Sequence, residues 1–263
     1  MQAIKIGNVE IVALVDTIEA YPFSVVYPKA ELLDWHREYL DDDNNVALNF
    51  GAYVVREGET TLLVDTGWGP EHHGRLLEEL AAASIMPGAV THVLFTHLHG
   101  DHTGWNIDRG TGLPLFANAR YLVPQLDWEY FGEKERRLGS FARDVAPLEA
   151  AGVMDLIGGE TTITGGLTAI ATPGHTPGHT SLLVASQGAR ACVLGDVVIT
   201  SIDAAEPELR TAFDWDHDVA VKTRVATVDR LIADGSTVAA SHLPAPGLGT
   251  FVRKDGRRHW QSL

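Results

Sequence analysis

Runs of apolar and β-branched residues predict a group of strands near the start of the chain. Residues 4–15 and 47–55 alternate or run apolar, and residues 60–64 follow the turn-like sequence Glu57-Gly58-Glu59. We expect these strands to form a meander. Between the first two of them, residues 21–45 combine prolines with an acidic run, which predicts an irregular rim segment beside a functional site.

Helical spacing alternates with short apolar runs along the rest of the chain. Helices are predicted at 70–83, 125–151 and 219–233, and strands at 92–96, 167–171, 181–185, 191–197 and 238–240. Alternation of this kind predicts an α/β fold in which helices cover sheets. We find no repeat and no low-complexity linker, so residues 1–263 are expected to form a single domain.

Composition narrows the classes of partner. The chain carries 35 acidic and 20 basic residues, a net charge of −15, which would repel a phosphate backbone, so nucleic acid is not an expected partner. We see no membrane-spanning run and no pattern of a signal peptide, which predicts a cytoplasmic protein without a membrane partner. Cys192 is the single cysteine, lies in an apolar run and is expected to be buried packing.

The strongest chemical signal is the run His97-Leu98-His99-Gly100-Asp101-His102, directly after the strand predicted at 92–96. Zinc needs imidazole nitrogens and carboxylate oxygens at about 2.0 to 2.2 Å, and a compact loop after a buried strand can supply them. Four ligand-type side chains in so short a loop suggest two neighbouring divalent metals, with Zn²⁺ expected and Fe, Mn or Co as alternatives.

Two metals need more ligands than one loop offers, and three further candidates follow predicted strands. His175 lies in a Thr-Pro-Gly-His turn after the strand at 167–171, Asp196 follows Val193-Leu194-Gly195, and His242 follows the strand at 238–240. Each one alone is more typical of a cap or turn residue. Together with the first loop, we expect them to be ligands.

These motifs resemble those of the metallo-β-lactamase superfamily. The resemblance covers Asp65 to His242 and implies a four-layered αββα sandwich with the metals at one edge between two sheets. It implies two metal sites that share a carboxylate. The members are His97, His99 and His175 for the first metal, Asp101, His102 and His242 for the second, and Asp196 as the bridge.

The resemblance also implies roles in catalysis. A hydroxide held between two metals is a nucleophile near neutral pH, while a metal polarises the oxygen of the bond under attack. Asp101 and Asp196 are the expected catalytic residues, with Asp101 able to pass a proton to the leaving group. Asp65 matches the family's supporting aspartate and is expected to orient a ligand imidazole.

Within the superfamily, the carboxylate at Asp196 and the segment 242–249 resemble the quorum-quenching lactonases and the methyl-parathion-type hydrolases. The chain has Ile199 where acyl-homoserine lactonases carry a tyrosine. A hydrolase of small lactones, carboxylic esters or organophosphates is therefore expected, and a homodimer is the oligomeric state considered for it. The alternative is a non-hydrolytic, mononuclear iron oxygenase of the persulfide dioxygenase type, which shares the early ligands.

Aromatic residues near these motifs are candidates for the wall of a substrate pocket, although aromatic residues at helical spacing are more often core. The candidates of first choice are Phe23, Trp35, Trp105, Trp128 and Phe131, and Tyr21, Tyr27 and Tyr130 are plausible on the same ground.

Overall fold

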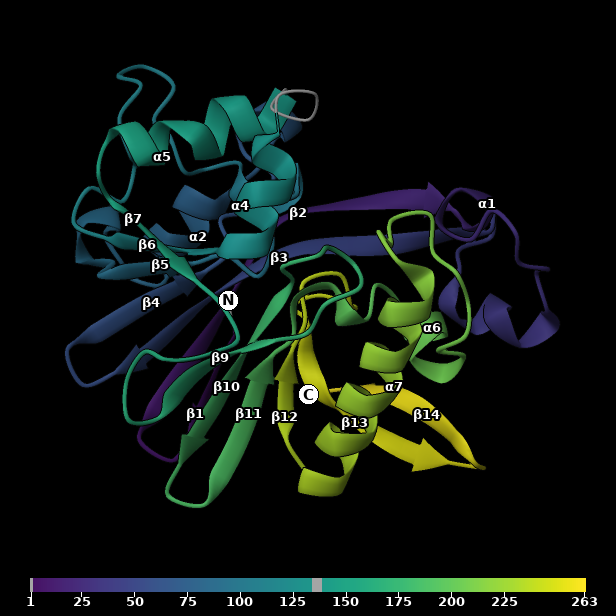
Figure 1. Ribbon diagram of the computed structural model, residues 1–263. Helices are drawn as coiled ribbons and strands as arrows, with labels where there is room; N and C mark the ends of the chain where they lie inside the picture. The colour runs from purple at the N-terminus through teal and green to yellow at the C-terminus, as the bar shows by residue number, and fades with distance from the viewer. Residues whose placement is uncertain (1, 134–138) are drawn as a thin grey trace.

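The computed structural model, which describes residues 2–133 and 139–263, consists of two β-sheets packed face to face with helices on both outer surfaces (Figure 1). The order of the four layers is helix, sheet, sheet, helix. The α/β class and the αββα sandwich expected from the sequence are therefore confirmed.

The first sheet has seven strands in the order β1 to β7. Its strands pair antiparallel from β1 to β4 and parallel from β4 to β7. The strands are β1 Gln2–Ile6, β2 Val9–Pro22, β3 Asn45–Glu57, β4 Thr60–Val64, β5 His92–Leu94, β6 Arg120–Pro124 and β7 Met154–Ile157. Its associated helices are η2 Pro70–His72, α2 Leu76–Ala82, η3 Pro87–Ala89, α3 Gly100–Thr103, α4 Gln125–Gly132, η4 Phe141–Val145 and α5 Ala146–Ala150.

The second sheet also has seven strands, in the order β14 to β8. Its strands are β8 Glu160–Thr162, β9 Leu167–Ala171, β10 Thr180–Ser186, β11 Ala189–Val193, β12 Thr237–Ala239, β13 Leu248–Lys254 and β14 Arg257–Ser262. The long helix α7 His217–Asp234 covers its outer face, with η5 Gly195–Val197 and α6 Ser201–Ala205 nearby (Figure 1). In the rim segment, β2 continues to Pro22, and the short helices α1 Phe23–Val26 and η1 Asp34–Tyr39 follow.

Strand β4 shows how the sequence builds the layers. Leu62 and Val64 pack in the cluster between the two sheets, whereas Leu63 faces the other way, into the cluster with Leu76 and Leu80 of α2. Successive side chains of a strand point to opposite faces, so a strand buried on both sides is apolar at every position. This explains why Leu62, Leu63 and Val64 form a continuous apolar run at the end of the strand.

Several predicted boundaries need correction. The helix expected at 70–83 is interrupted, because His73 adopts a left-handed conformation with φ 57° and the buried carboxylate of Asp16 accepts a hydrogen bond from the backbone N–H of Leu76, where α2 begins. The helix predicted at 125–151 is divided into α4, η4 and α5, and its residues 134–138 lie outside the described part. The strand predicted at 191–197 ends at Val193, where a short helical turn follows.

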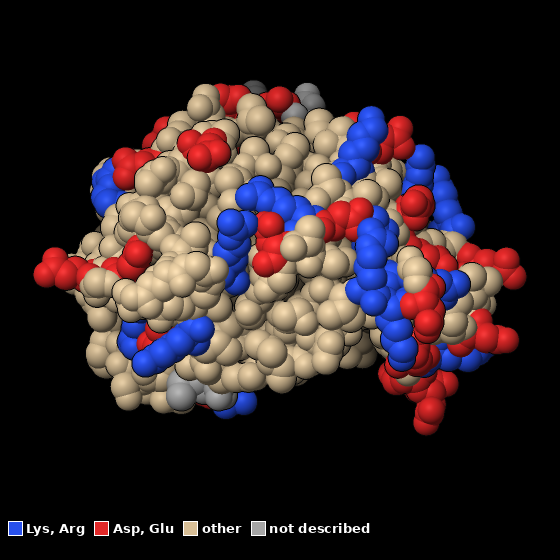
Figure 2. All heavy atoms as spheres, turned by 90° about the horizontal axis from the view of Figure 1, so that it is seen from below, with Lys and Arg blue, Asp and Glu red and all other residues tan. Residues whose placement is uncertain are grey.

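The surface carries both signs of charge. On the face shown in Figure 2, basic side chains lie beside acidic ones. The structure contains ion pairs of Arg253 and Arg258 with Asp229, and of Arg190 with Asp234. No helix in the described ranges is long and apolar enough to cross a bilayer.

The packing between the sheets predicts a large effect for Leu62→Ala. Leu62 is fully buried, and truncating such a side chain costs about 2 to 5 kcal/mol of the free energy of unfolding. Leu113→Ala is the matched control, because Leu113 is 63% exposed and its truncation is expected to change this free energy by less than about 0.5 kcal/mol. Urea denaturation of both variants measures the difference, and equal losses would contradict the assigned packing.

Candidate metal centre

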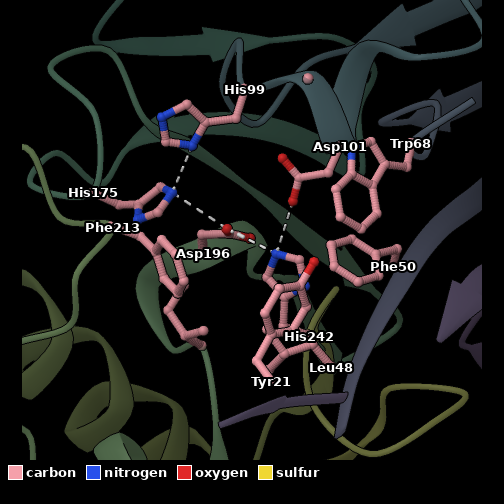
Figure 3. A pocket seen from close by; sticks show the side chains of 12 residues that line it. Tyr21, Leu48, Phe50, Trp68, His99, Asp101, His175, Asp196, Phe213 and His242 are labelled. Atoms are coloured by element: carbon pink, nitrogen blue, oxygen red, sulfur yellow. Dashed lines mark hydrogen bonds and ion pairs between the residues drawn. The ribbon is translucent and has the colours of Figure 1, made fainter. Parts of the chain in front are cut away.

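The ends of several strands bring the predicted ligands to one edge of the sandwich. In the second sheet β9 and β11 are both antiparallel to β10, and β12 is parallel to β11, so β9, β11 and β12 end on the same side. His175, Asp196 and His242 stand in the loops that follow these three strands. The loop after β5 of the first sheet brings His99 and Asp101 to the same place (Figure 3).

Three imidazoles form the first group of converging ligand atoms. Nδ1 of His99 lies 3.0 Å from Nε2 of His97 and 3.0 Å from Nε2 of His175. Tetrahedral zinc with Zn–N bonds of about 2.0 to 2.1 Å places its ligand atoms roughly 3.3 Å apart. The three nitrogens thus have the mutual spacing of ligands around one metal ion.

Asp101, His102 and His242 form a second group. Oδ2 of Asp101 lies 3.5 Å from Nε2 of His102 and 3.4 Å from Nε2 of His242. Asp196 stands between the two groups, with Oδ2 at 3.3 Å from Nε2 of His175 and 3.0 Å from Nε2 of His242 (Figure 3). The structure therefore brings together every residue that the sequence nominated as a ligand.

Two buried polar atoms of this cluster have no hydrogen-bond partner among residues 2–133 and 139–263. Nε2 of His102 and Oδ1 of Asp196 accept or donate no hydrogen bond, although they lie 3.4 Å apart. Burying polar atoms without a partner costs free energy. A divalent cation between imidazole nitrogens and carboxylate oxygens satisfies both, so the donor set fits such metals.

The electrostatics of the first group favour the neutral imidazoles that bind metals. Burial, followed by the charge of His175, lowers the pKa of His99 to about 3. Burial also raises the pKa of Asp196, but the imidazoles of His242 and His102 outweigh it and hold this pKa well below its ordinary value. His97 and His99 thus present neutral nitrogens beside an ionised carboxylate.

Asp65 supports the loop as the resemblance implied. This residue has φ 59°, and its carboxylate accepts hydrogen bonds from the backbone N–H and the hydroxyl of Thr96, at 2.7 and 2.8 Å. Its Oδ2 also lies 2.8 Å from Nδ1 of His102. Nδ1 therefore donates to Asp65, and Nε2 of His102 is left as the atom that faces a metal.

Asp127 of α4 is a second support, which the sequence analysis missed. This fully buried carboxylate accepts hydrogen bonds from the backbone N–H groups of Leu98 and Gly178, at 3.2 and 2.6 Å, and from the hydroxyl of Thr176 at 2.8 Å. It thereby joins the loop of His97 to the loop of His175. No local motif distinguishes Asp127 from any other acidic residue of a helix.

Asp214 and Arg224 form a third support that was also missed. Oδ1 of Asp214 lies 3.4 Å from Nδ1 of His175, and its Oδ2 accepts a hydrogen bond of 3.1 Å from Arg224 of α7. The buried guanidinium of Arg224 also donates to the carbonyl of Val197, next to Asp196, at 2.9 Å. Arg224 therefore ties the loops of two ligands together.

His179, four residues after His175, has protein partners at both of its ring nitrogens. Nε2 accepts a hydrogen bond of 2.9 Å from the backbone N–H of Asp196, so Nδ1 carries the proton and donates to the hydroxyl of Thr172 at 2.8 Å. Gly195 lets this happen: it has φ +60°, and a Cβ there would lie 2.7 Å from Nε2 of His179.

A pocket of about 370 Å³ opens above the ligand cluster. His99, Asp101, His175, Asp196 and His242 form its polar floor (Figure 3). Its remaining side-chain wall is largely apolar and aromatic, and consists of Tyr21, Leu48, Phe50, Trp68, Ile199 and Phe213.

The aromatic residues of first choice are not on this wall. Phe23 packs in the core of the rim segment, and Trp35 lies beside that core. Trp128 contacts Phe141, and the indole N–H of Trp105 donates to Asp16. Phe131 lies with its ring centroid 5.6 Å from that of His99, outside the pocket lining.

For Trp128 and Phe131 of α4, helical spacing explains the error, because both side chains pack against the core beneath the helix. Of the plausible candidates, Tyr21 does line the pocket. Trp68 was overlooked because it stands in a loop without periodicity. It packs against Phe50, with the ring centroids 4.3 Å apart and the ring planes tilted by 30°.

Comparison with known proteins identifies relatives. The family model described as the metallo-beta-lactamase superfamily matches residues 52–252. "Metallo-beta-lactamase domain-containing protein 1" from Xenopus laevis is 37% identical over 150 residues, which are 57% of this chain and 52% of that protein. This chain thus spans about half the length of that relative.

Two solved structures are similar over almost the whole chain. The hydrolase AbOPH, described as in the beta lactamase superfamily, has a TM-score of 0.89 and 26% identity, with 99% of this chain and 96% of that chain covered. AidC, a dizinc quorum-quenching lactonase in complex with a product N-hexnoyl-L-homoserine, has a TM-score of 0.87 and 22% identity, with 100% and 97% covered. At this identity, the second likeness is one of fold.

The contact between Asp214 and His175 predicts that Asp214→Asn weakens metal binding. The amide lacks the charge that faces His175 and Arg224, and loss of such outer partners lowers metal affinity by about 10- to 100-fold. Competition with a chromophoric chelator measures the affinity. Asp218→Asn is the control, because the Asp218 side chain is 78% exposed and forms its ion pair with Arg210, away from the ligand cluster. Equal affinity in both variants would show that Asp214 does not position His175.

Proposed function

This chain belongs to the metallo-beta-lactamase superfamily, and we propose that within it the chain is a dinuclear metal-dependent hydrolase of lactones, carboxylic esters or organophosphates. One observation carries the proposal: two groups of converging ligand atoms share Asp196 at the floor of an apolar pocket. Zinc is the proposed metal, because imidazole nitrogens and carboxylate oxygens are its usual donors.

The similar structures support a hydrolase. AbOPH is itself a hydrolase, and AidC is a dizinc lactonase. The structural likeness extends over nearly all of this chain in both cases. We therefore extend to this chain the two-metal arrangement and the cleavage of small neutral esters.

Each group of the centre has a part in the proposed reaction. When bound, two divalent metals supply an activated water and polarise the oxygen of the scissile bond. Asp196, only 2% exposed, holds its two carboxylate oxygens between the groups. The side chain of Asp101 is 22% exposed, so one of its oxygens can exchange a proton with a leaving group in the pocket.

The pocket wall favours uncharged substrates. Leu48, Phe50, Ile199 and Phe213 present apolar surface beside the floor, and an apolar site binds the uncharged part of a small ligand without a desolvation penalty. Small lactones, aryl esters and phosphotriesters meet this condition.

The two groups predict the metal content. We expect wild-type chain reconstituted with zinc and dialysed to contain two zinc ions per chain, and His242→Ala to retain one, because the group of His97, His99 and His175 stays complete. Inductively coupled plasma mass spectrometry measures the zinc content of both proteins. One zinc ion per reconstituted wild-type chain would contradict the proposal, and a single oxygen-reactive iron in the chain as purified would favour the iron oxygenase.

The proposed activity is tested with a panel of lactones, aryl esters, phosphotriesters and β-lactams, each assayed with defined metals. We expect hydrolysis of a lactone, ester or triester, and a loss of at least about 100-fold in Asp196→Ala, because electrostatic groups at the reaction centre contribute on this scale. Circular dichroism checks that the variant is folded. Full activity of a folded Asp196→Ala chain would refute the central role of this carboxylate.

A further inference from the structure

The polar atoms on the pocket wall are unevenly distributed. Among the described lining residues, the carboxylates Asp101 and Asp196 belong to the metal groups, and Leu48, Phe50, Ile199 and Phe213 have no polar side-chain atom. The hydroxyl of Tyr21 is the one neutral side-chain oxygen of that described lining. Any polar recognition of a substrate by a wall oxygen outside the metal groups therefore falls to Tyr21.

Strand pairing directs Tyr21 and Glu19 to the same face. In the pairing of β2 with β3, Glu19 stands opposite Leu48, and Tyr21 is two positions further along β2. Residues two apart on a strand share a face, so Tyr21, Glu19 and Leu48 lie together. Figure 3 shows Tyr21 and Leu48 beside His242, on the side of the centre that also holds Asp101.

Glu19 determines which way the Tyr21 hydroxyl is used. The hydroxyl donates its hydrogen to Oε2 of Glu19 at 3.0 Å. A phenol has one hydrogen, and once this is engaged by a carboxylate the oxygen presents lone pairs to its other neighbours. Burial, together with Glu19, raises the pKa of Tyr21 above its ordinary range, so the hydroxyl remains protonated and neutral.

An acceptor in an apolar wall selects for a complementary donor. A substrate N–H or O–H that enters the pocket loses its hydrogen bonds to water, and Ile199 and Phe213 offer no replacement. The oxygen of Tyr21 does offer one. A substrate without such a donor leaves this oxygen without a partner from the ligand.

We propose that the Tyr21–Glu19 pair is a specificity determinant that favours esters and lactones with a hydrogen-bond donor, an amide N–H or a hydroxyl, next to the scissile bond. The proposal rests on the proposed hydrolase function and narrows its substrate class. Phosphotriesters without a donor are accordingly the poorer substrates of the panel.

A matched pair of compounds tests this inference: α-hexanoylamino-γ-butyrolactone and its N-methyl analogue, which lacks the amide N–H. For the zinc-loaded wild-type chain we expect kcat/KM to be roughly tenfold higher for the N–H compound, the scale of one hydrogen bond. In Tyr21→Phe, the ratio of the two values is expected to fall to about one. Because steric effects of the methyl group are present in both enzymes, the change in the ratio isolates the hydrogen bond.

Tyr39→Phe is the control, since Tyr39 is also a partly buried tyrosine but does not line this pocket. It is expected to keep the wild-type ratio. Zinc content measured in all three proteins excludes an indirect effect through the metals. A wild-type ratio near one, or an unchanged ratio in Tyr21→Phe, would overturn the inference while leaving the hydrolase function intact.

Failure of the hydrolase function has a different signature. In that case the zinc-loaded chain cleaves no compound of the panel, and titration calorimetry of the same two lactones with wild type and Tyr21→Phe replaces the kinetics. Preferential binding of the N–H compound by the wild type alone would support the role of Tyr21. Equal binding in both proteins would refute it.

Discussion

The convergence of bare imidazole nitrogens on one another is the constraint on which the rest of this structure depends. Nε2 of His97 and Nε2 of His175 each lie 3.0 Å from Nδ1 of His99. A ring nitrogen has one lone pair or one hydrogen, so Nδ1 can fully satisfy only one of these two contacts, whereas a cation between the three nitrogens satisfies all of them. The ligand cluster lies at the edge of the sandwich. One hydrophobic cluster between the two sheets, and one between each sheet and its helices, supply the stability that the ligand cluster itself lacks.

Buried carboxylates away from the ligand set hold the converging side chains in place. Asp65 orients His102, Asp127 joins the loops of His97 and His175, and Asp214 contacts His175 from behind. Each carboxylate connects segments that are distant in the sequence. Precise placement of ligands therefore depends on three local polar networks rather than on the loops alone.

The ligand set could be predicted because metal chemistry restricts both the residue types and their position after strands. His175, Asp196 and His242 each follow an apolar run, and such runs are visible in a sequence. The supports could not be predicted in the same way. Asp214 lies 39 residues from His175, and only the packing of α7 on the second sheet brings Arg224 to Asp214 and to the carbonyl of Val197.

Some strands of the fold could likewise be predicted from the sequence, and others could not. β4 and β9 were predicted to the residue, because both consist of apolar residues and threonine, which are typical of strands, and turn residues precede them. β13 and β14 were not predicted, since they form an edge hairpin with exposed, basic positions such as Arg253 and Arg257. The pocket wall was predicted poorly for a related reason: aromatic residues on helices contact their own core, and loop residues such as Trp68 carry no periodic signal.

The central claim is that one carboxylate, Asp196, joins two metal ions. A crystal structure of the zinc-loaded chain, with anomalous diffraction recorded at the zinc edge, tests it most directly. The account predicts two anomalous peaks about 3.5 to 4 Å apart, one beside His97, His99 and His175 and one beside Asp101, His102 and His242, with an oxygen of Asp196 in contact with both. A single peak, or two peaks of which only one contacts Asp196, would contradict it.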